Sequence, residues 1–253
     1  MTKKITLLNT RPSEKEQLTQ KTFEKHGFKV INFPCIEISC NQKNKDTAIK
    51  QLCAIASNDT LIFTSQHAVR CAFNLFPQWQ IPNQATVIAL GSKTSECLKK
   101  REGIKVLTPE QQNSEGVIEL LQSLNSPSCI SLVTAKHGRN QIQHYAHLNG
   151  IALQQINVYY RQLPKTQDHG EIEKTKNLYI LATSVTTLEN LQKLLSPTSL
   201  KHVQNNTLIC ASERIARAAK KQGFEHCLIS HTANPERISA FLLSMLTESP
   251  TKH

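Results

Sequence analysis

The chain has 253 residues, 39% hydrophobic and 19% charged, which at roughly 150 residues per domain favours two globular domains over a disordered or fibrous protein. Its apolar runs are far shorter than the roughly 20 residues of a membrane-spanning helix, and no signal-peptide core follows Met1, so we expect neither membrane insertion nor secretion. The 30 Lys and Arg against 19 Asp and Glu give a formal charge of +11, which favours an anionic partner: nucleic acid, a membrane surface or a polyacidic small molecule.

In chain order, four short apolar runs at 5–8, 87–90, 130–133 and 207–210 are each followed by a polar stretch of helical periodicity. Each stretch ends at a glycine before the next apolar run, a pattern typical of a left-handed helix cap. The four glycines are Gly27, Gly103, Gly150 and Gly223. Four strand–helix–strand units predict an α/β fold with parallel sheets covered by helices, and they exclude all-α and all-β folds.

These units also repeat. The layout of 7–34 returns at 132–159, 60–65 resembles 178–184, and 87–94 resembles 207–214, all at an offset of about 120 residues. Such a spacing indicates two related lobes rather than a short-period solenoid.

Two β-rich segments, 33–40 and 156–164, contain proline and interrupt the helix–strand rhythm. We interpret them as a two-stranded bridge between the lobes. One lobe then joins residues 1–34 to 165–253, the other is inserted as 38–160, and the linkers fall near 35–38 and 160–165. Each lobe would hold one copy of each repeated unit.

In an open parallel sheet, ligands bind beyond the carboxyl ends of the strands, where helix N-termini present free N–H groups. Small hydroxyl residues and cations recur after the predicted strands. A single Ser or Thr there is often an ordinary N-cap, but the recurrence suits several carboxylates. The candidate binding residues are Thr10, Arg11, Thr64, Ser65, Gly91, Ser92, Lys93, Thr94, the segment 134–139 with Gly138 and Arg139, Thr183, Ser184, Ser212 and Arg214.

Cofactor and metal motifs are absent from the sequence. There is no G-x-G-x-x-G after a strand, no P-loop, no G-x-S-x-G and no Cys-x-x-Cys pair. The eight cysteines lie mostly beside apolar runs, so we expect reduced core residues of a cytoplasmic protein. His144 and His147 lack a third ligand and predict a solvated helix face. We expect no cofactor and no metal.

Several stretches together carry a family resemblance, although each alone is weak. They are 10–12 (Thr-Arg-Pro), 33–38, 61–69, 89–94, Gly138-Arg139, Val158-Tyr159, 212–216 and 223–224. In order and spacing they resemble the uroporphyrinogen-III synthase family over nearly the whole chain. This resemblance implies two flavodoxin-like α/β lobes joined by a two-stranded ladder, and a cofactor-free lyase. The reaction would close hydroxymethylbilane, a linear tetrapyrrole with eight carboxylates, to uroporphyrinogen III with loss of water and inversion of ring D.

For the proton transfer, the family points to a tyrosine in the return linker, where Tyr159 fits best and the adjacent Tyr160 is the alternative. A phenol is ordinarily protonated at neutral pH and can donate to the departing hydroxyl. Thr94 matches the family's Gly-x-x-Thr turn, and Thr64 and Ser65 its Thr-Ser turn. Ser212 replaces a glycine and Arg214 a hydroxyl residue found in other members.

The expected partners are the bilane and, transiently, the enzyme that makes it, with the protein itself a monomer. A non-catalytic bilobed receptor for an anionic metabolite is the alternative function. A nucleic-acid binder is disfavoured because aromatic residues are only 5% and the cations are spread along the chain. We likewise expect no membrane partner.

Overall fold

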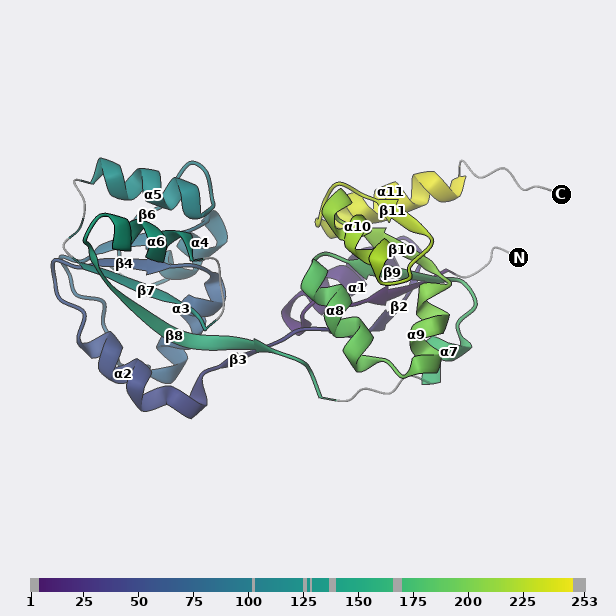
Figure 1. Cartoon of the computed structure of the whole chain (residues 1–253), viewed down its shortest axis with the longest axis horizontal. Helices are drawn as coiled ribbons and strands as arrows, with labels where there is room; N and C mark the ends of the chain where they lie inside the picture. Colours follow the sequence, from purple (N-terminus) through teal and green to yellow (C-terminus); the bar gives the residue numbers. More distant parts are fainter. Residues whose placement is uncertain are drawn as a thin grey trace. The chain divides into compact units, whose positions relative to one another are not determined.

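The computed structural model describes residues 5–101, 103–124, 127, 129–136, 140–165 and 170–247. The chain forms two compact units: unit 1 is Met1–Glu37 with Gln162–His253, and unit 2 is Ile38–Arg161 (Figure 1). No helix among the described residues is long and apolar enough to cross a membrane.

Within its described residues, unit 1 is a five-stranded parallel sheet in the order β11-β10-β9-β1-β2, with helices on both faces. Buried strand residues alternate between the faces: Leu7 packs with Phe23 and Leu242, whereas Leu8 packs with Leu188 and Ala216. The strands are β1 (Thr6–Asn9), β2 (Lys29–Asn32), β9 (Leu178–Ala182), β10 (Thr207–Cys210) and β11 (Cys227–Ile229). The helices are η1 (Ser13–Lys15), α1 (Glu16–Lys25), α7 (Gly170–Lys174), α8 (Val185–Leu194), α9 (Pro197–Gln204), α10 (Glu213–Lys221) and α11 (Pro235–Thr247).

Unit 2, where described, has a six-stranded sheet in the order β3-β8-β7-β4-β5-β6. Figure 1 shows α5 and α6 on one side of this sheet and α2 and α3 on the other. The strands are β3 (Glu37–Cys40), β4 (Thr60–Phe63), β5 (Thr86–Ala89), β6 (Val106–Leu107), β7 (Cys129–Ala135) and β8 (Ala152–Gln162). The helices are η2 (Gln42–Asn44), α2 (Lys45–Cys53), α3 (Gln66–Leu75), α4 (Ser92–Lys99), α5 (Ser114–Ser123) and α6 (Gln141–Leu148).

The predicted α/β class with parallel sheets is therefore confirmed. The β-rich segments singled out in the sequence become β3 and β8, which are neighbours in one sheet. Here the amide of Asn41 donates to the carbonyl of Val158 at 2.8 Å, and the side chain of Gln162 donates to Glu37 at 3.0 Å.

The repeated sequence segments occupy equivalent places in the two sheets. In unit 1 the order is β2-β1-β9-β10-β11, and in unit 2 the matching strands follow the same order as β8-β7-β4-β5-β6. The two units differ in how the chain threads these strands and in the extra strand β3. In each unit the crossovers run in opposite directions from one central strand pair, β1/β9 or β7/β4, which is where α/β sheets bind ligands.

Helix termination follows the sequence prediction. Gly27, Gly103, Gly150 and Gly223 all have φ between 65° and 84°, the left-handed conformation that a glycine adopts without a steric penalty.

The expectation that every cysteine is reduced is wrong for two of them. Cys40 at the end of β3 and Cys71 in α3 form a disulfide, with Cα atoms 5.2 Å apart and a separation of 31 positions in sequence. The prediction rested on local apolar context, which says nothing about two cysteines that only the fold brings together. Cys35 and Cys210 are free and buried as expected, whereas Cys53 is free but exposed.

Candidate functional site

The central strand pair of unit 1 ends in a buried threonine and a buried arginine. Thr10 is fully buried and its hydroxyl donates to the carbonyl oxygen of Leu181, which ties the end of β1 to β9. This hydroxyl therefore has a structural partner. Arg11 is the next residue and lies beside the start of the η1–α1 helical segment.

Arg11 is only 6% exposed. Its Nη1 donates to Thr19 Oγ1 over a long 3.4 Å, and its Nε has no hydrogen-bond partner among the described residues. Burial lowers the pKa of Arg11 because a desolvated guanidinium is less stable in its charged form. A buried cation of this kind gains most from a bound anion.

The other candidates of unit 1 follow β9 and β10. Ser184 caps α8 by accepting the Thr187 amide at 3.1 Å. Thr183 precedes it and is partly buried. Ser212 stands at the N-cap of α10 without a side-chain capping bond, and Arg214 is exposed in the first turn.

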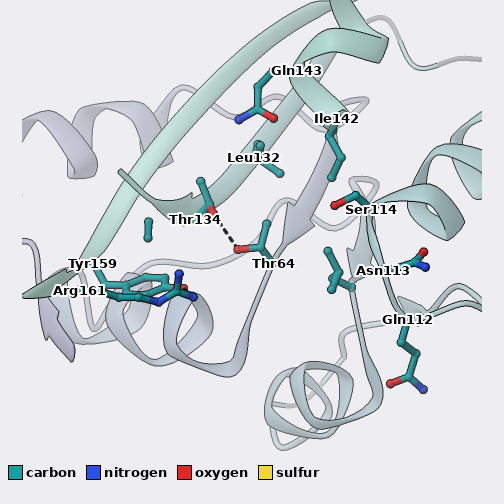
Figure 2. A pocket seen from close by; sticks show the side chains of 12 residues that line it. Thr64, Gln112, Asn113, Ser114, Leu132, Thr134, Ile142, Gln143, Tyr159 and Arg161 are labelled. Carbon is teal, nitrogen blue, oxygen red and sulfur yellow. Dashed lines mark hydrogen bonds between the residues drawn. The ribbon is translucent and has the colours of Figure 1, made fainter. Parts of the chain in front are cut away.

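Unit 2 has a cavity of about 310 Å³ at the carboxyl ends of its central strands. Thr64 directly follows β4, and Thr134 is the second-to-last residue of β7. Their hydroxyl groups are hydrogen-bonded to each other at 2.9 Å. Figure 2 shows this pair on one wall, with Tyr159 and Arg161 nearby and Gln112, Asn113 and Ser114 across the cavity. The lining residues are Thr64, Leu90, Gln112, Asn113, Ser114, Leu132, Thr134, Ala135, Ile142, Gln143, Tyr159 and Arg161.

A β-bulge aims Tyr159 at this cavity. In the β7–β8 register, Thr134 pairs with Asn157 but Ala135 pairs with Tyr159, so one residue of β8 is skipped. A bulge of this kind turns the following side chain to the opposite face of the strand. Tyr159 consequently joins Ile156 and Val158 in the same buried cluster and lines the cavity, whereas Tyr160 does not line it.

The phenol of Tyr159 is 2% exposed and lies against three polar side chains. Ser65 Oγ donates to its hydroxyl at 3.0 Å, and Arg161 Nη2 donates to it at 3.5 Å. The ring of His67 lies 5.9 Å from the ring of Tyr159, centroid to centroid. Ser65 also caps α3 by accepting the amide of Ala68 at 3.1 Å.

The predicted Gly91–Thr94 turn lies next to the cavity wall rather than in it. The side-chain carbonyl of Gln112 accepts the Ser92 amide at 3.0 Å and the Ser92 hydroxyl at 3.3 Å. A Cβ on Gly91 would lie 3.0 Å from that same Gln112 oxygen, so a glycine here allows the close approach. Lys93 is exposed and Thr94 is buried.

The cavity thus brings together only part of the predicted set. Thr64, Thr134 and Tyr159 line it, and Ser65 contacts it through Tyr159. Gly138 and Arg139 lie outside the described residues. Gln112–Ser114, Gln143 and Arg161 also line the cavity and were not predicted from the sequence. The segment 112–114 comes after β6, a two-residue strand too short to stand out in the sequence. Arg161 is two residues beyond Tyr159 on one strand, a spacing that indicates a shared face.

The described residues contain no group of three or more His, Cys, Asp and Glu side chains that could hold a metal ion. His144 and His147 are both exposed on α6, as the sequence predicted.

Comparison with known proteins places the chain in one family. The family model for uroporphyrinogen-III synthase HemD matches residues 17–240. A Methanocaldococcus jannaschii protein, named provisionally as a uroporphyrinogen-III synthase, is 23% identical over 225 residues, 85% of this chain and 89% of its own.

Solved structures show the same fold at low sequence identity. A mutant uroporphyrinogen III synthase from Thermus thermophilus is 15% identical with a TM-score of 0.62, covering 96% of this chain and 100% of its own. The uroporphyrinogen-III synthetase from Helicobacter pylori is 15% identical, also with a TM-score of 0.62, covering 96% and 99%. With the family model matching most of its length, this chain belongs to the uroporphyrinogen-III synthase family.

Proposed function

We propose that this protein is a uroporphyrinogen-III synthase, a carbon–oxygen lyase that closes hydroxymethylbilane to uroporphyrinogen III in tetrapyrrole and haem biosynthesis. The observation that carries the proposal is the buried Tyr159, aimed by a bulge into a cavity of mixed polar and apolar lining at the carboxyl ends of the parallel strands. In a chain of this family, that is where a proton donor for the leaving hydroxyl is needed.

The substrate is a polyanion, and both units offer groups that suit carboxylates. Arg11 presents a buried guanidinium in unit 1, and its Nε has no hydrogen-bond partner within the part of the chain that the structure describes. The amide side chains of Gln112 and Asn113 line the cavity in unit 2. The helices α3, α4, α8 and α10 begin directly after parallel strands, and their N-termini favour negative charge. Holding a flexible chain in its reactive geometry can lower the barrier by roughly 7–11 kcal/mol.

The proton balance needs one donor that later recovers its proton. Tyr159 gives its phenol proton to the terminal hydroxyl, the carbon–oxygen bond breaks and water leaves. The carbon so activated bonds to the already substituted carbon of ring D and forms a spiro intermediate. The bond from that ring carbon to its original methylene bridge then breaks, and the freed methylene bonds to the unsubstituted carbon of ring D, which inverts the ring. A ring carbon loses one proton at closure, and this proton restores the phenol. Substrate is thereby converted to product plus water, without an oxidant or a reductant.

The isomer formed from freshly generated hydroxymethylbilane tests this function. The bilane closes spontaneously to the symmetric type I product, so we expect type III in excess when the protein is present. If type I alone forms while the protein binds the bilane, the protein is a non-catalytic receptor and the proposal is wrong.

Replacing Tyr159 by Phe tests the proton donor. Because a positioned general acid contributes at least about 100-fold in many enzymes, we expect Tyr159→Phe to lower kcat on the order of 100-fold while a thermal melt shows that the protein still folds. Tyr160→Phe is the matched comparison, since Tyr160 does not line the cavity. A loss confined to the Tyr160 variant would transfer the role to that residue.

A further inference from the structure

Both hydrogen-bond partners of the Tyr159 hydroxyl among the described residues act as donors. Ser65 Oγ accepts the Ala68 amide at 3.1 Å and donates its own proton to Tyr159 at 3.0 Å. Arg161 Nη2 lies 3.5 Å from the same oxygen, and a guanidinium can only donate. A phenol oxygen accepts up to two hydrogen bonds and donates one, so its two acceptor positions are filled and its proton is left over.

We infer that Ser65 and Arg161 are positioning residues that direct the phenol proton of Tyr159 into the cavity. With both acceptor directions occupied, the remaining O–H direction points away from Ser65 and Arg161. Tyr159 is buried on its other sides and lines the cavity of about 310 Å³. The inference rests on the proposed function, in which this proton goes to the departing hydroxyl group.

The positive charge of Arg161 also stabilises the phenol oxygen of Tyr159 as it loses its proton. Its Cζ lies 5.9 Å from the centre of the Tyr159 ring. When the phenol gives up its proton, negative charge develops on an oxygen that already accepts a bond from this cation. A fixed donor aimed at developing charge stabilises the transition state more than the ground state. Removal of Arg161 should therefore lower kcat and leave substrate binding almost unchanged.

The experiment compares steady-state kinetics of the wild type, Arg161→Gln, Tyr159→Phe and the double variant with hydroxymethylbilane as substrate. We expect Arg161→Gln to lower kcat roughly tenfold, the effect of one hydrogen bond from a charged donor, with KM changed less than about twofold. In the Tyr159→Phe background, the same change should alter kcat less than about twofold, because Arg161 acts through the phenol.

Arg70→Gln is the matched control. Arg70 is exposed on α3, the helix that Ser65 caps, and the substitution removes the same charge from the same unit. Its kcat and KM should equal those of the wild type, so an effect of net charge alone would appear in both variants.

Ser65→Gly tests the second donor. Glycine is accepted at an N-cap, so the variant loses the hydroxyl while α3 keeps a tolerated cap, and a thermal melt checks the fold. We expect kcat to fall roughly threefold to tenfold, and this loss should again disappear in the Tyr159→Phe background.

Three results would overturn the inference while leaving the proposed function intact: unchanged kinetics in Arg161→Gln, a raised KM with unchanged kcat, or the same fold loss with and without the Tyr159 hydroxyl. The second result would make Arg161 a contact for a substrate carboxylate instead. The separate effects of Arg161→Gln on KM and on kcat distinguish these roles even if Tyr159→Phe is too slow for the double variant to be measured. A wild-type protein that forms no type III isomer overturns the proposed function, and the inference with it.

Discussion

Replacing Arg11 by Met is expected to stabilise the fold and weaken substrate binding at the same time. Arg11 is 6% exposed, its Nε has no partner among the described residues, and its bond to Thr19 is 3.4 Å long. Replacing a buried, poorly paired charge with an apolar side chain of similar length gains roughly 1–4 kcal/mol. Losing the bond to Thr19 costs about 1 kcal/mol, so we expect a net gain of about 0–3 kcal/mol.

This gain should not depend on pH in the usual working range. Burial lowers the pKa of Arg11, so the folded state disfavours the protonated guanidinium. The resulting penalty is fully present below the folded pKa and is relieved only as pH rises through it. Because arginine stays protonated at neutral pH, the wild type carries the penalty at neutral and acid pH.

Urea unfolding and steady-state kinetics measure the two effects. We expect the free energy of unfolding to rise and KM for hydroxymethylbilane to increase roughly tenfold, the value of one charge-assisted carboxylate contact. Arg217→Met on α10 is the control, since Arg217 is exposed in the same unit and its replacement should leave both quantities nearly unchanged. If Arg11→Met instead lowers the free energy of unfolding by more than about 1 kcal/mol, the guanidinium is a structural support and the reasoning is refuted.

Three further predictions concern the fold around the site. Gly116→Ala would place a Cβ 2.1 Å from the backbone oxygen of Gln111, next to the loop that lines the cavity. We therefore expect thermal unfolding to show a loss of roughly 1–3 kcal/mol in stability, whereas the same change in an unhindered helix would add about 1 kcal/mol. Reduction of the disulfide between Cys40 and Cys71, which lie 31 positions apart in sequence, should lower the free energy of unfolding in urea by roughly 2–4 kcal/mol. Equal unfolding curves with and without reductant would contradict this prediction. Burial raises the pKa of Cys210 to about 12, so mass spectrometry after alkylation at mildly alkaline pH should show Cys53 modified and Cys210 unmodified. The folded state should also lose stability as pH rises above the ordinary thiol pKa, because Cys210 ionises first in the unfolded chain.

The fold was largely predictable because its signals are local. A polar helix, a left-handed glycine and a short apolar strand recur at Gly27, Gly103, Gly150 and Gly223, and all four glycines adopt positive φ. The strand order shared by the two sheets follows from the same repeats, because equivalent segments pack in equivalent ways. The disulfide was not predictable, since only the fold brings Cys40 in β3 and Cys71 in α3 together, and no sequence pattern links them.

The site was only partly predictable, for a physical reason. Residues at strand ends, such as Thr64, are placed by the parallel sheet itself, and the sequence predicts where the strands end. The bulge in β8 has no comparable signal, yet it decides whether Tyr159 or Tyr160 lines the cavity. The loop 112–114 reaches the cavity because Gln112 bonds to Ser92, a contact between segments 20 residues apart.

The duplicated fold lets the roles of the two units be compared at equivalent positions. Ser65 and Ser184 cap equivalent helices in the same way: each side-chain oxygen accepts, at 3.1 Å, the backbone amide of the residue three positions later. Their remaining hydrogen bonds differ: Ser65 donates to the phenol of Tyr159, whereas Ser184 pairs locally with the hydroxyl of Thr187 at 2.7 Å. The capping serine of unit 2 therefore contacts Tyr159, whereas the capping serine of unit 1 contacts its own helix. If unit 1 supplies carboxylate contacts and unit 2 the proton, Arg11→Met must act on KM and Tyr159→Phe on kcat, and a loss of kcat from Arg11→Met would show that the units share the chemistry instead.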